Sequence, residues 1–548
     1  MSAIFDLHCH PSFKPFNAKN EDGIIPDPNI WKKRQPTEDQ KVWILEKFDV
    51  GSVFESQINL DAAIEGKLRC ITLALYPLER GFVKRGSHQD DSGPFDTDLL
   101  NLDKLIAFIT GFDVERINEL QAFTRSYFTQ LQQEYEYLKR HQGKNTLSKC
   151  GYEYQLVSSF NEIEIALNRT DKKVFPIIPS IEGAHAFASD ILKKGKVVNM
   201  VKEEKKKDSP HFKKFQERLL ANILKVKTEW EHPPFFITFS HHFYNHLSGH
   251  AQTFEFPITI ANWLLHQKGK IHGKKYFDLG ITDFGKQALK LLLMRYQKEG
   301  KKYRSILIDV KHMSAQARID YYKLLQTTYK DQPIPIICSH SAVNGRKTIL
   351  EAYTYPAKKK AQKKSTFNLG NINLFDDEIR TIINSDGLIG VMIDERRILG
   401  KKLPEDALAT DMDMYALWKK ESQEKAKSVC ISVIFNQLLH IVAVYGSEKA
   451  WNHICLGSDY EGLINPVDLY TSAEGFKNME TDFVTHWEER LAIPDSDNPQ
   501  VQRYKELVFD KTPAYFIRKF LWENSMDFLQ KYFNDGYLLD GVPQITLV

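Results

Sequence analysis

SILIDV (Ser305–Val310) and IPIICS (Ile334–Ser339) are short apolar runs rich in β-branched residues, and AQARIDYYKLLQTT (Ala315–Thr328) lies between them. Such runs are typical of buried parallel strands. The apolar residues of the intervening segment recur at three- and four-residue spacing, which indicates an amphipathic helix. The three segments therefore predict a strand, a helix and a second strand parallel to the first.

The same pattern recurs along the chain. Eight runs are predicted to be strands: Ala3–Leu7, Cys70–Tyr76, Val174–Ile181, Phe235–Ser240, Ser305–Val310, Ile334–Ser339, Leu388–Ile393 and His453–Gly457. Further helical patterns cover Phe284–Glu299 and the tail from Pro513 to Tyr532, which we expect outside the barrel. This alternation predicts an α/β fold of the (β/α)8 TIM-barrel type, although a doubly wound open sheet could use the same pieces.

The length exceeds what a barrel requires. A barrel core takes about 250 residues, and the chain has 548. The surplus lies mainly in elaborated connections near 11–64, 78–173, 186–234 and 394–452. No Pro-, Gly- or Ser-rich linker separates a second unit, so we expect residues 1–548 to form a single domain with long inserted loops and extra helices.

The composition excludes a disordered, a collagen-like or a coiled-coil protein. Apolar residues make up 42% of the chain and charged residues 26%, and the net charge is only +3. These values are typical of a globular protein and indicate neither nucleic acid nor a membrane surface as a partner. The best apolar run, Ile431–Tyr445, is too short to span a membrane and contains polar residues. Six scattered cysteines without a CxxC pair, and an N-terminus without a signal-peptide pattern, predict a cytoplasmic protein.

Polar residues gather where the predicted strands end. The first strand runs into Asp6-Leu7-His8-Cys9-His10, and alternation places both imidazoles on one face, where they can reach one metal ion. Other strands end near Glu182, His241, His312, His340 and Asp459. Each residue alone has a commonplace explanation, as a hydrogen-bonded core histidine or a turn aspartate. Because strand ends converge on one rim of a barrel, their coincidence predicts a metal site there.

Four other histidines are expected to stay outside this site. His242, His246 and His250 stand at four-residue spacing, but Gly249 weakens a helix there and a second metal site is disfavoured. His185 lies beyond Glu182 and is expected to support the structure rather than bind metal.

Several blocks of the sequence resemble the renal (membrane) dipeptidase family of the amidohydrolase superfamily. They are DLHCHPS, PSIEGAHAF, ITFSHHFYN, GITDFGKQALKLL followed by ILIDVKHMS, IICSHSAVNGR and HICLGSDYEG. The blocks occur in the family's order between residues 4 and 465, which also favours the barrel over the open sheet.

The resemblance implies a site with two divalent metal ions, usually zinc. It implies that His8 and His10 bind one ion, that His312 and His340 bind the other, and that Glu182 bridges both. His241 matches the histidine that contacts the substrate carbonyl, and Asp459 matches the aspartate that transfers the proton. Arg346 is the first candidate to hold a substrate carboxylate, with Arg396 and Arg397 as rivals. The chain departs from the family in having His10 where renal-type members often have aspartate.

The function implied is hydrolysis of a dipeptide or similar small amide by a metal-activated hydroxide. Another small amide, a lactam or an ester is the alternative substrate, and a site with one metal ion is the alternative centre. An inactive, metal-stabilised binding scaffold is a further alternative. The resemblance also suggests a homodimer.

Overall fold

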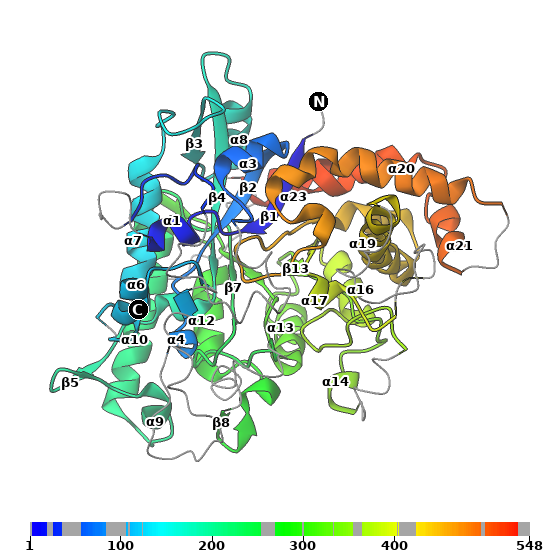
Figure 1. Ribbon diagram of the computed structural model, residues 1–548. Helices are drawn as coiled ribbons and strands as arrows, with labels where there is room; N and C mark the ends of the chain where they lie inside the picture. The colour runs from blue at the N-terminus through cyan, green and yellow to red at the C-terminus, as the bar shows by residue number, and fades with distance from the viewer. Residues whose placement is uncertain are drawn as a thin grey trace, which may run out of the picture.

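Eight parallel strands form the centre of the protein in the computed structural model of Figure 1. In the order of their hydrogen bonding they are β1 (Ile4–Cys9), β2 (Leu68–Leu75), β4 (Lys173–Glu182), β7 (Phe236–Thr238), β12 (Leu307–Asp309), β13 (Ile337–Ser341), β14 (Leu388–Val391) and β15 (Ile454–Leu456). All eight coincide with predicted strands, so the predicted strand order is confirmed. The structure describes residues 3–18, 26–34, 56–83, 106–107, 110–122, 124–253, 269–298, 301–332, 334–354, 364–402, 404, 423–494 and 499–534.

The first and last of these strands meet and complete the ring. The Asp459 amide donates to the His8 carbonyl at 2.9 Å, and the His10 amide donates to the Tyr460 carbonyl at 3.0 Å. A parallel bridge joins Cys9 to Tyr460. The fold is therefore a nearly closed (β/α)8 barrel, as predicted.

Helices and short hairpins occupy the connections (Figure 1). The helices before β12 are α1 (Phe13–Asn17), α3 (Leu60–Glu65), α4 (Arg80–Val83), α6 (Val114–Gln121), α7 (Tyr127–His141), α8 (Phe160–Leu167), α9 (Met200–Glu204), α10 (Pro210–Glu229) and α12 (Asp283–Leu293). Those after it are α13 (Ala315–Thr327), α14 (Glu351–Thr354), α16 (Asp376–Asn384), α17 (Glu395–Ile398), α19 (Gln423–Tyr445), α20 (Met479–Leu491), α21 (Pro499–Glu506), α22 (Pro513–Arg518) and α23 (Asn524–Tyr532). The hairpins pair β5 (Leu192–Lys193) with β6 (Lys196–Val197), β8 (Lys270–Ile271) with β9 (Lys274–Lys275), and β10 (Tyr296–Lys298) with β11 (Lys301–Tyr303).

Two local predictions need correction. The helix predicted over Phe284–Glu299 ends at Leu293, because the chain becomes extended at Met294 and continues into β10; the buried Lys227 side chain donates to the Leu291 and Leu292 carbonyls at 2.7 Å and so satisfies the helix end. The prediction also missed β3 (Tyr152–Leu156), which pairs parallel with the first half of β4. Parts of the long connections predicted near 11–64, 78–173 and 394–452 lie outside the described residues.

The helical tail covers the amino-terminal end of the barrel. α22, a π-helical turn at Lys519–Glu523 and α23 run without a break over the predicted Pro513–Tyr532 segment. The Asn524 side chain donates to the Ile454 carbonyl at 2.8 Å, and the Phe235 ring lies 6.0 Å from that of Phe528. Both contacts are at the beginnings of barrel strands.

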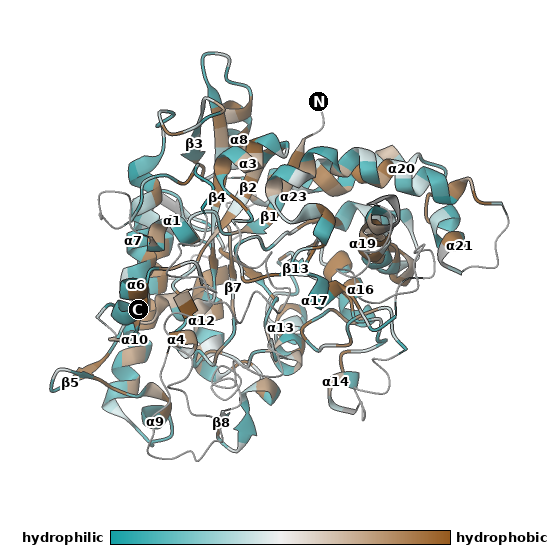
Figure 2. Cartoon of the chain, in the orientation of Figure 1, coloured by the Kyte–Doolittle hydropathy of each residue, from teal (hydrophilic) through white to brown (hydrophobic). Residues whose placement is uncertain are grey.

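One helix has the length and apolar composition of a membrane span. The segment Ala426–Tyr445 of α19 is long and apolar enough to cross a membrane, and it is longer than the run Ile431–Tyr445 recognised in the sequence. In this protein, however, 83% of that segment is buried inside the structure. α19, largely brown in Figure 2, therefore belongs to the core.

Candidate metal centre

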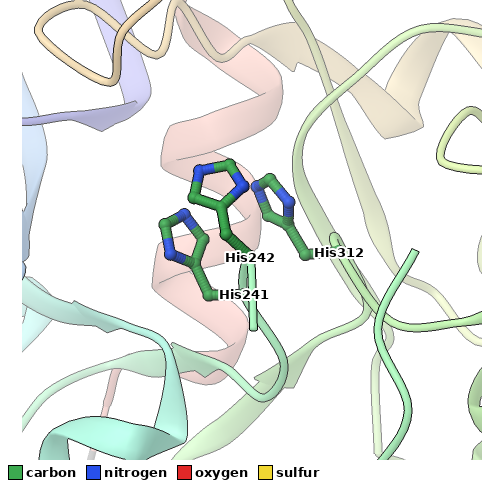
Figure 3. Close-up of side chains that lie close together, drawn as sticks. All are labelled: His241, His242 and His312. Carbon is green, nitrogen blue, oxygen red and sulfur yellow. The ribbon is translucent and has the colours of Figure 1, made fainter. Parts of the chain in front are cut away.

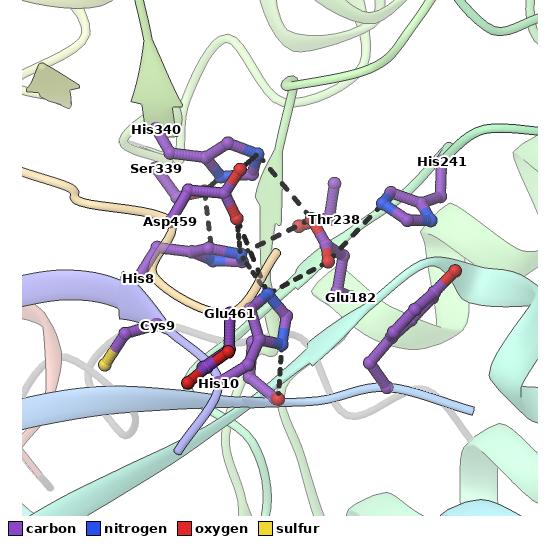
Figure 4. Close-up of polar contacts among 12 residues, drawn as sticks. His8, Cys9, His10, Glu182, Thr238, His241, Ser339, His340, Asp459 and Glu461 are labelled. Atoms are coloured by element: carbon purple, nitrogen blue, oxygen red, sulfur yellow. Dashed lines mark hydrogen bonds and ion pairs between the residues drawn. The ribbon is translucent and has the colours of Figure 1, made fainter. Parts of the chain in front are cut away.

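The predicted ligands lie together at the carboxyl ends of the barrel strands. Figure 4 shows His8 from β1, His10 directly after it, Glu182 from the end of β4, His241 after β7, His340 from β13 and Asp459 after β15. His312, which follows β12, joins them. All of these side chains are buried, so the structure brings the predicted residues into one enclosed cluster.

The first group of ligands surrounds one side of Glu182. The Nε2 atom of His10 lies 3.1 Å from Glu182 Oε2, and that of His8 lies 3.4 Å from Oε1. The two Nε2 atoms are only 3.1 Å apart. Asp459 Oδ1 lies 3.7 Å from His8 Nε2 and 3.6 Å from His10 Nε2. Four side chains thus direct possible ligand atoms towards one point.

The second group shares Glu182 with the first. The Nε2 atoms of His312 and His340 each lie 3.6 Å from Glu182 Oε1, and they are 3.1 Å from each other. Glu182 therefore stands between two pairs of imidazoles, which is the placement that a bridging carboxylate requires.

Outer hydrogen bonds fix the orientation of these imidazoles. His10 Nδ1 lies 3.0 Å from the Ala74 carbonyl, so Nδ1 carries the proton and Nε2 presents a lone pair to the cluster. His340 Nδ1 lies 2.8 Å from Ser339 Oγ, whose hydroxyl donates to Asp309 at 2.6 Å. Bonds of this kind to the far nitrogen are a regular feature of metal-binding histidines.

The charges of the cluster are also arranged for a cation. Burial alone would raise the pKa of Glu182, but the surrounding imidazoles, His241 first and then His10 and His8, hold the pKa well below its ordinary range, so Glu182 is an anionic ligand. Burial raises the pKa of Asp459, whose Oδ1 atom is buried without a hydrogen-bond partner among the described residues. Four imidazole nitrogens facing two carboxylates, one with an unpartnered oxygen, fit a divalent ion bound by nitrogen and oxygen ligands.

Two ligand positions have strained backbone. His312 has φ 64° and Asp459 has φ 62°, in the left-handed region that side chains other than glycine rarely adopt. Both residues follow directly after a barrel strand or lie in the turn beyond it. Strain of this kind is held at functional sites, at a cost of about 1–3 kcal/mol per residue.

His241 is held by a residue that the sequence analysis missed. Its Nδ1 atom lies 2.7 Å from Glu79 Oε2, while its Nε2 atom lies 3.4 Å from Glu182. Burial lowers the pKa of His241, but the charges of Glu182 and Glu79 outweigh it and raise the pKa to about 9. Glu79 also accepts the backbone amide of Phe243 at 3.0 Å and is buried. No spacing in the sequence connects Glu79 to His241, so only the fold reveals the pair.

The other histidines are placed largely as expected. His246 pairs with Glu204 at 2.6 Å, His250 Nδ1 lies 3.0 Å from the Ala251 carbonyl, and His185 Nε2 lies 2.8 Å from the Pro77 carbonyl. His242 differs, because it lies beside His241 and His312 in a third compact group of potential ligands (Figure 3). The consecutive histidines at the end of β7 were the signal for it.

A cavity of about 540 Å³ opens beside the cluster. Glu182, His241, His312 and Asp459 line it on the side of the predicted ligands. Its other lining residues include His242, Lys311, Asn368, Arg396, Arg397 and Lys401. Burial, together with the charge of Arg397, lowers the pKa of Lys311 to about 8. The cavity is large enough for a molecule of dipeptide size.

The structure does not bring Arg346 to this cavity. Its guanidinium donates to Asn371 Oδ1 at 2.8 Å and to the Glu351 carbonyl, and it lies 4.7 Å from the centre of the Phe375 ring. Arg346 is absent from the lining of the cavity, whereas Arg396 and Arg397 are part of it. Of the rivals, Arg396 is paired with Asp394 at 2.9 Å, and Arg397 donates to the Thr253 carbonyl.

Comparisons with known proteins find likeness in structure alone. No protein-family model and no curated protein matches the chain. Among solved structures, the chain is similar to a dipeptidase AC described as a metallopeptidase of family M19, with 13% identity and a TM-score of 0.42 over 97% of this chain and 99% of that one. It is also similar to a metallopeptidase from Rhodobacter sphaeroides liganded with a phosphinate mimic of the dipeptide L-Ala-D-Ala, with 14% identity and a TM-score of 0.45 over 97% and 99%. The probable dipeptidase PvdM from Pseudomonas aeruginosa matches with 13% identity and a TM-score of 0.44 over 98% and 96%. These likenesses assign no role to any residue of this chain.

Proposed function

We propose that this protein is a metal-dependent hydrolase of the renal dipeptidase family that cleaves the peptide bond of a dipeptide or a similar small amide. The observation that carries the proposal is the buried convergence of His8, His10, His312, His340 and Asp459 on Glu182. Two divalent ions, with zinc as the best match to nitrogen and carboxylate ligands, would be held by the four imidazoles of this cluster and by Glu182. When bound, such ions supply a nucleophilic hydroxide near neutral pH and polarise a carbonyl.

Asp459 is proposed to carry the proton. Asp459 lines the cavity, its Oδ1 atom has no hydrogen-bond partner among the described residues, and the raised pKa of the carboxyl suits a group that accepts a proton from the attacking water. The same proton then goes to the departing amine, which cannot leave as an anion. Asp459 thereby serves first as base and then as acid.

His241 is proposed to stabilise the negative charge that develops on the carbonyl oxygen. The Glu79 carboxylate, 2.7 Å from Nδ1, favours the protonated form of the imidazole. Nδ1–H donates to Glu79, so Nε2–H remains to donate to the substrate. One preorganised donor of this kind contributes about 3 kcal/mol to transition-state stabilisation.

Elemental analysis together with hydrolysis of a mixed dipeptide library tests the proposal. We expect about two equivalents of divalent metal, loss of hydrolysis on chelation, and its return when zinc is added. Glu182→Gln should weaken retention of both ions, whereas His246→Gln, which removes a histidine outside the cluster, should keep them. Purified protein that takes up no divalent ion would contradict the proposal.

A different small amide, a lactam or an ester is the second candidate substrate. The position of Arg346 supports this second candidate, because Arg346 was the first residue predicted to bind a dipeptide carboxylate and it lies outside the cavity. A panel of dipeptides, acylated amino acids, lactams and lactones distinguishes the two.

A cytoplasmic location, which six free cysteines favour, and a homodimer remain predictions.

A further inference from the structure

Lys311 is a buried cation without a partner in the cavity. It lies two residues beyond the end of β12, and only 2% of its surface is exposed. Its Nζ atom is buried and makes no hydrogen bond with the described part of the chain. A buried ammonium that lacks a partner is costly to keep. Its position in the cavity lining indicates that a ligand supplies the missing partner.

The nearest carboxylate in sequence is already occupied. Asp309 Oδ1 accepts the amides of Lys311 and Ser339, both at 3.0 Å. Asp309 Oδ2 accepts the hydroxyls of Thr238 at 2.7 Å and Ser339 at 2.6 Å. Asp309 therefore fixes the backbone of Lys311 but leaves the ammonium free to meet a ligand.

A second cation lines the same cavity. Arg397 lies in the lining of the cavity with Lys311, and its guanidinium donates to the Thr253 carbonyl. Two like charges beside one cavity repel each other, and a bound anion relieves that repulsion. No feature of this kind surrounds Arg346, which is bonded elsewhere.

We propose that Lys311, assisted by Arg397, is the residue that binds the substrate carboxylate next to the scissile bond. The inference rests on the proposed hydrolase function, because it concerns the substrate of that reaction. The binding of a carboxylate can nevertheless be measured without turnover. It assigns the carboxylate to a lysine at the end of β12 rather than to Arg346.

Binding of a matched pair of probes tests this assignment. The probes are 4-oxopentanoate, in which a methylene replaces the amide nitrogen of N-acetylglycine, and its uncharged amide, 4-oxopentanamide. Neither contains a peptide bond to cleave between the ketone and the acid. Calorimetry on the metal-loaded protein should show the carboxylate binding about tenfold more tightly, equivalent to ~1.4 kcal/mol. Equal binding of the two probes would overturn the proposal.

Variants locate the source of the preference. Lys311→Met should reduce the preference to less than twofold, and Lys311→Arg should retain most of it. Lys401→Met, which removes the same charge from an exposed position of the cavity lining, is the matched control and should change it less than twofold. A tenfold preference that survives in Lys311→Met would mean that the carboxylate is held elsewhere, for example by the metal ions, and would overturn the proposal.

Thermal unfolding separates ligand binding from a structural role. Because the ammonium is buried without a partner, Lys311→Met should unfold at the same temperature or a few degrees higher. A marked fall would show that Lys311 supports the fold instead. If no dipeptide is hydrolysed and the Lys311-dependent preference is present, the proposed function fails and this inference stands. If dipeptides are hydrolysed and the preference is absent, the inference alone fails.

Discussion

The two ends of the barrel are built from the same strands but carry opposite kinds of side chain. At the carboxyl end, His10 and Asp459 direct polar atoms at one another, and Asp459 Oδ1 has no hydrogen-bond partner among the described residues. At the amino end, Phe235 packs on Phe528 and Phe533, with ring centres 6.0 and 4.9 Å apart, and Asn524 binds the carbonyls of Trp451 and Ile454. The amino end is closed mainly by aromatic packing, while the carboxyl end gathers buried imidazoles and carboxylates around a cavity.

The two ends of the barrel are expected to serve different purposes, stability at the amino end and function at the carboxyl end. In (β/α)8 barrels, residues at the carboxyl ends of the strands perform chemistry, and those at the amino ends support the fold. Substitutions at the two ends should therefore change different measurements.

The largest effect is expected from Asp459→Asn at the carboxyl end. The amide keeps the shape of the side chain but cannot accept and return a proton, so kcat should fall about 10²–10⁴-fold. The metal content and the unfolding temperature should stay close to those of the parent protein. Parent-like turnover would remove Asp459 from the proposed mechanism and erase the contrast between the two ends.

Trp451→Ala probes the amino end. Trp451 is fully buried, its ring lies 4.9 Å from Phe516, and its Nε1–H donates to the Leu507 carbonyl at 3.0 Å. The cavity left behind should lower the free energy of unfolding by about 3–5 kcal/mol, measured with denaturant. Activity per folded molecule should not change. Exposed Lys511→Ala is the control, with a change within about 0.5 kcal/mol.

Glu79→Gln tests whether a residue at the carboxyl end that does not line the cavity still contributes to catalysis. Glu79 touches His241 but does not line the cavity, so it acts by positioning. Loss of its charge should lower kcat about 10- to 100-fold and leave KM nearly unchanged, as steady-state kinetics would show. Glu378→Gln is the matched control, since Glu378 is equally buried but is bonded to Tyr322 and Arg318. Similar losses of kcat in both variants would indicate a general structural effect.

The strands and the ligands at their ends could be predicted because the signals are local. β1 begins as a short apolar run and contains His8, with His10 directly after it, and each other ligand lies at or just beyond the end of a strand. The barrel then brings them together without further information. The prediction extended helix α12 too far, because the lysine that satisfies the carbonyls at its end comes from α10, distant in sequence.

The wall of the cavity could not be predicted in the same way. Arg346 follows the His340 motif closely, yet Asn371 and Glu351 hold it outside the cavity. Glu79 stands 162 positions from His241 and nevertheless contacts it. Loop paths depend on packing against distant elements, and a pattern of neighbouring residues does not contain that information.

The chain order of apolar runs and terminal histidines is enough to specify a barrel with four imidazoles and two carboxylates on one rim, because strand periodicity and parallel pairing are local and repetitive. Which additional charges face the bound molecule is a property of the folded whole. Loops that are distant in sequence pack together here. Their packing places Glu79 against His241 and His242 beside His312, and it leaves Lys311 without a hydrogen-bond partner among the described residues.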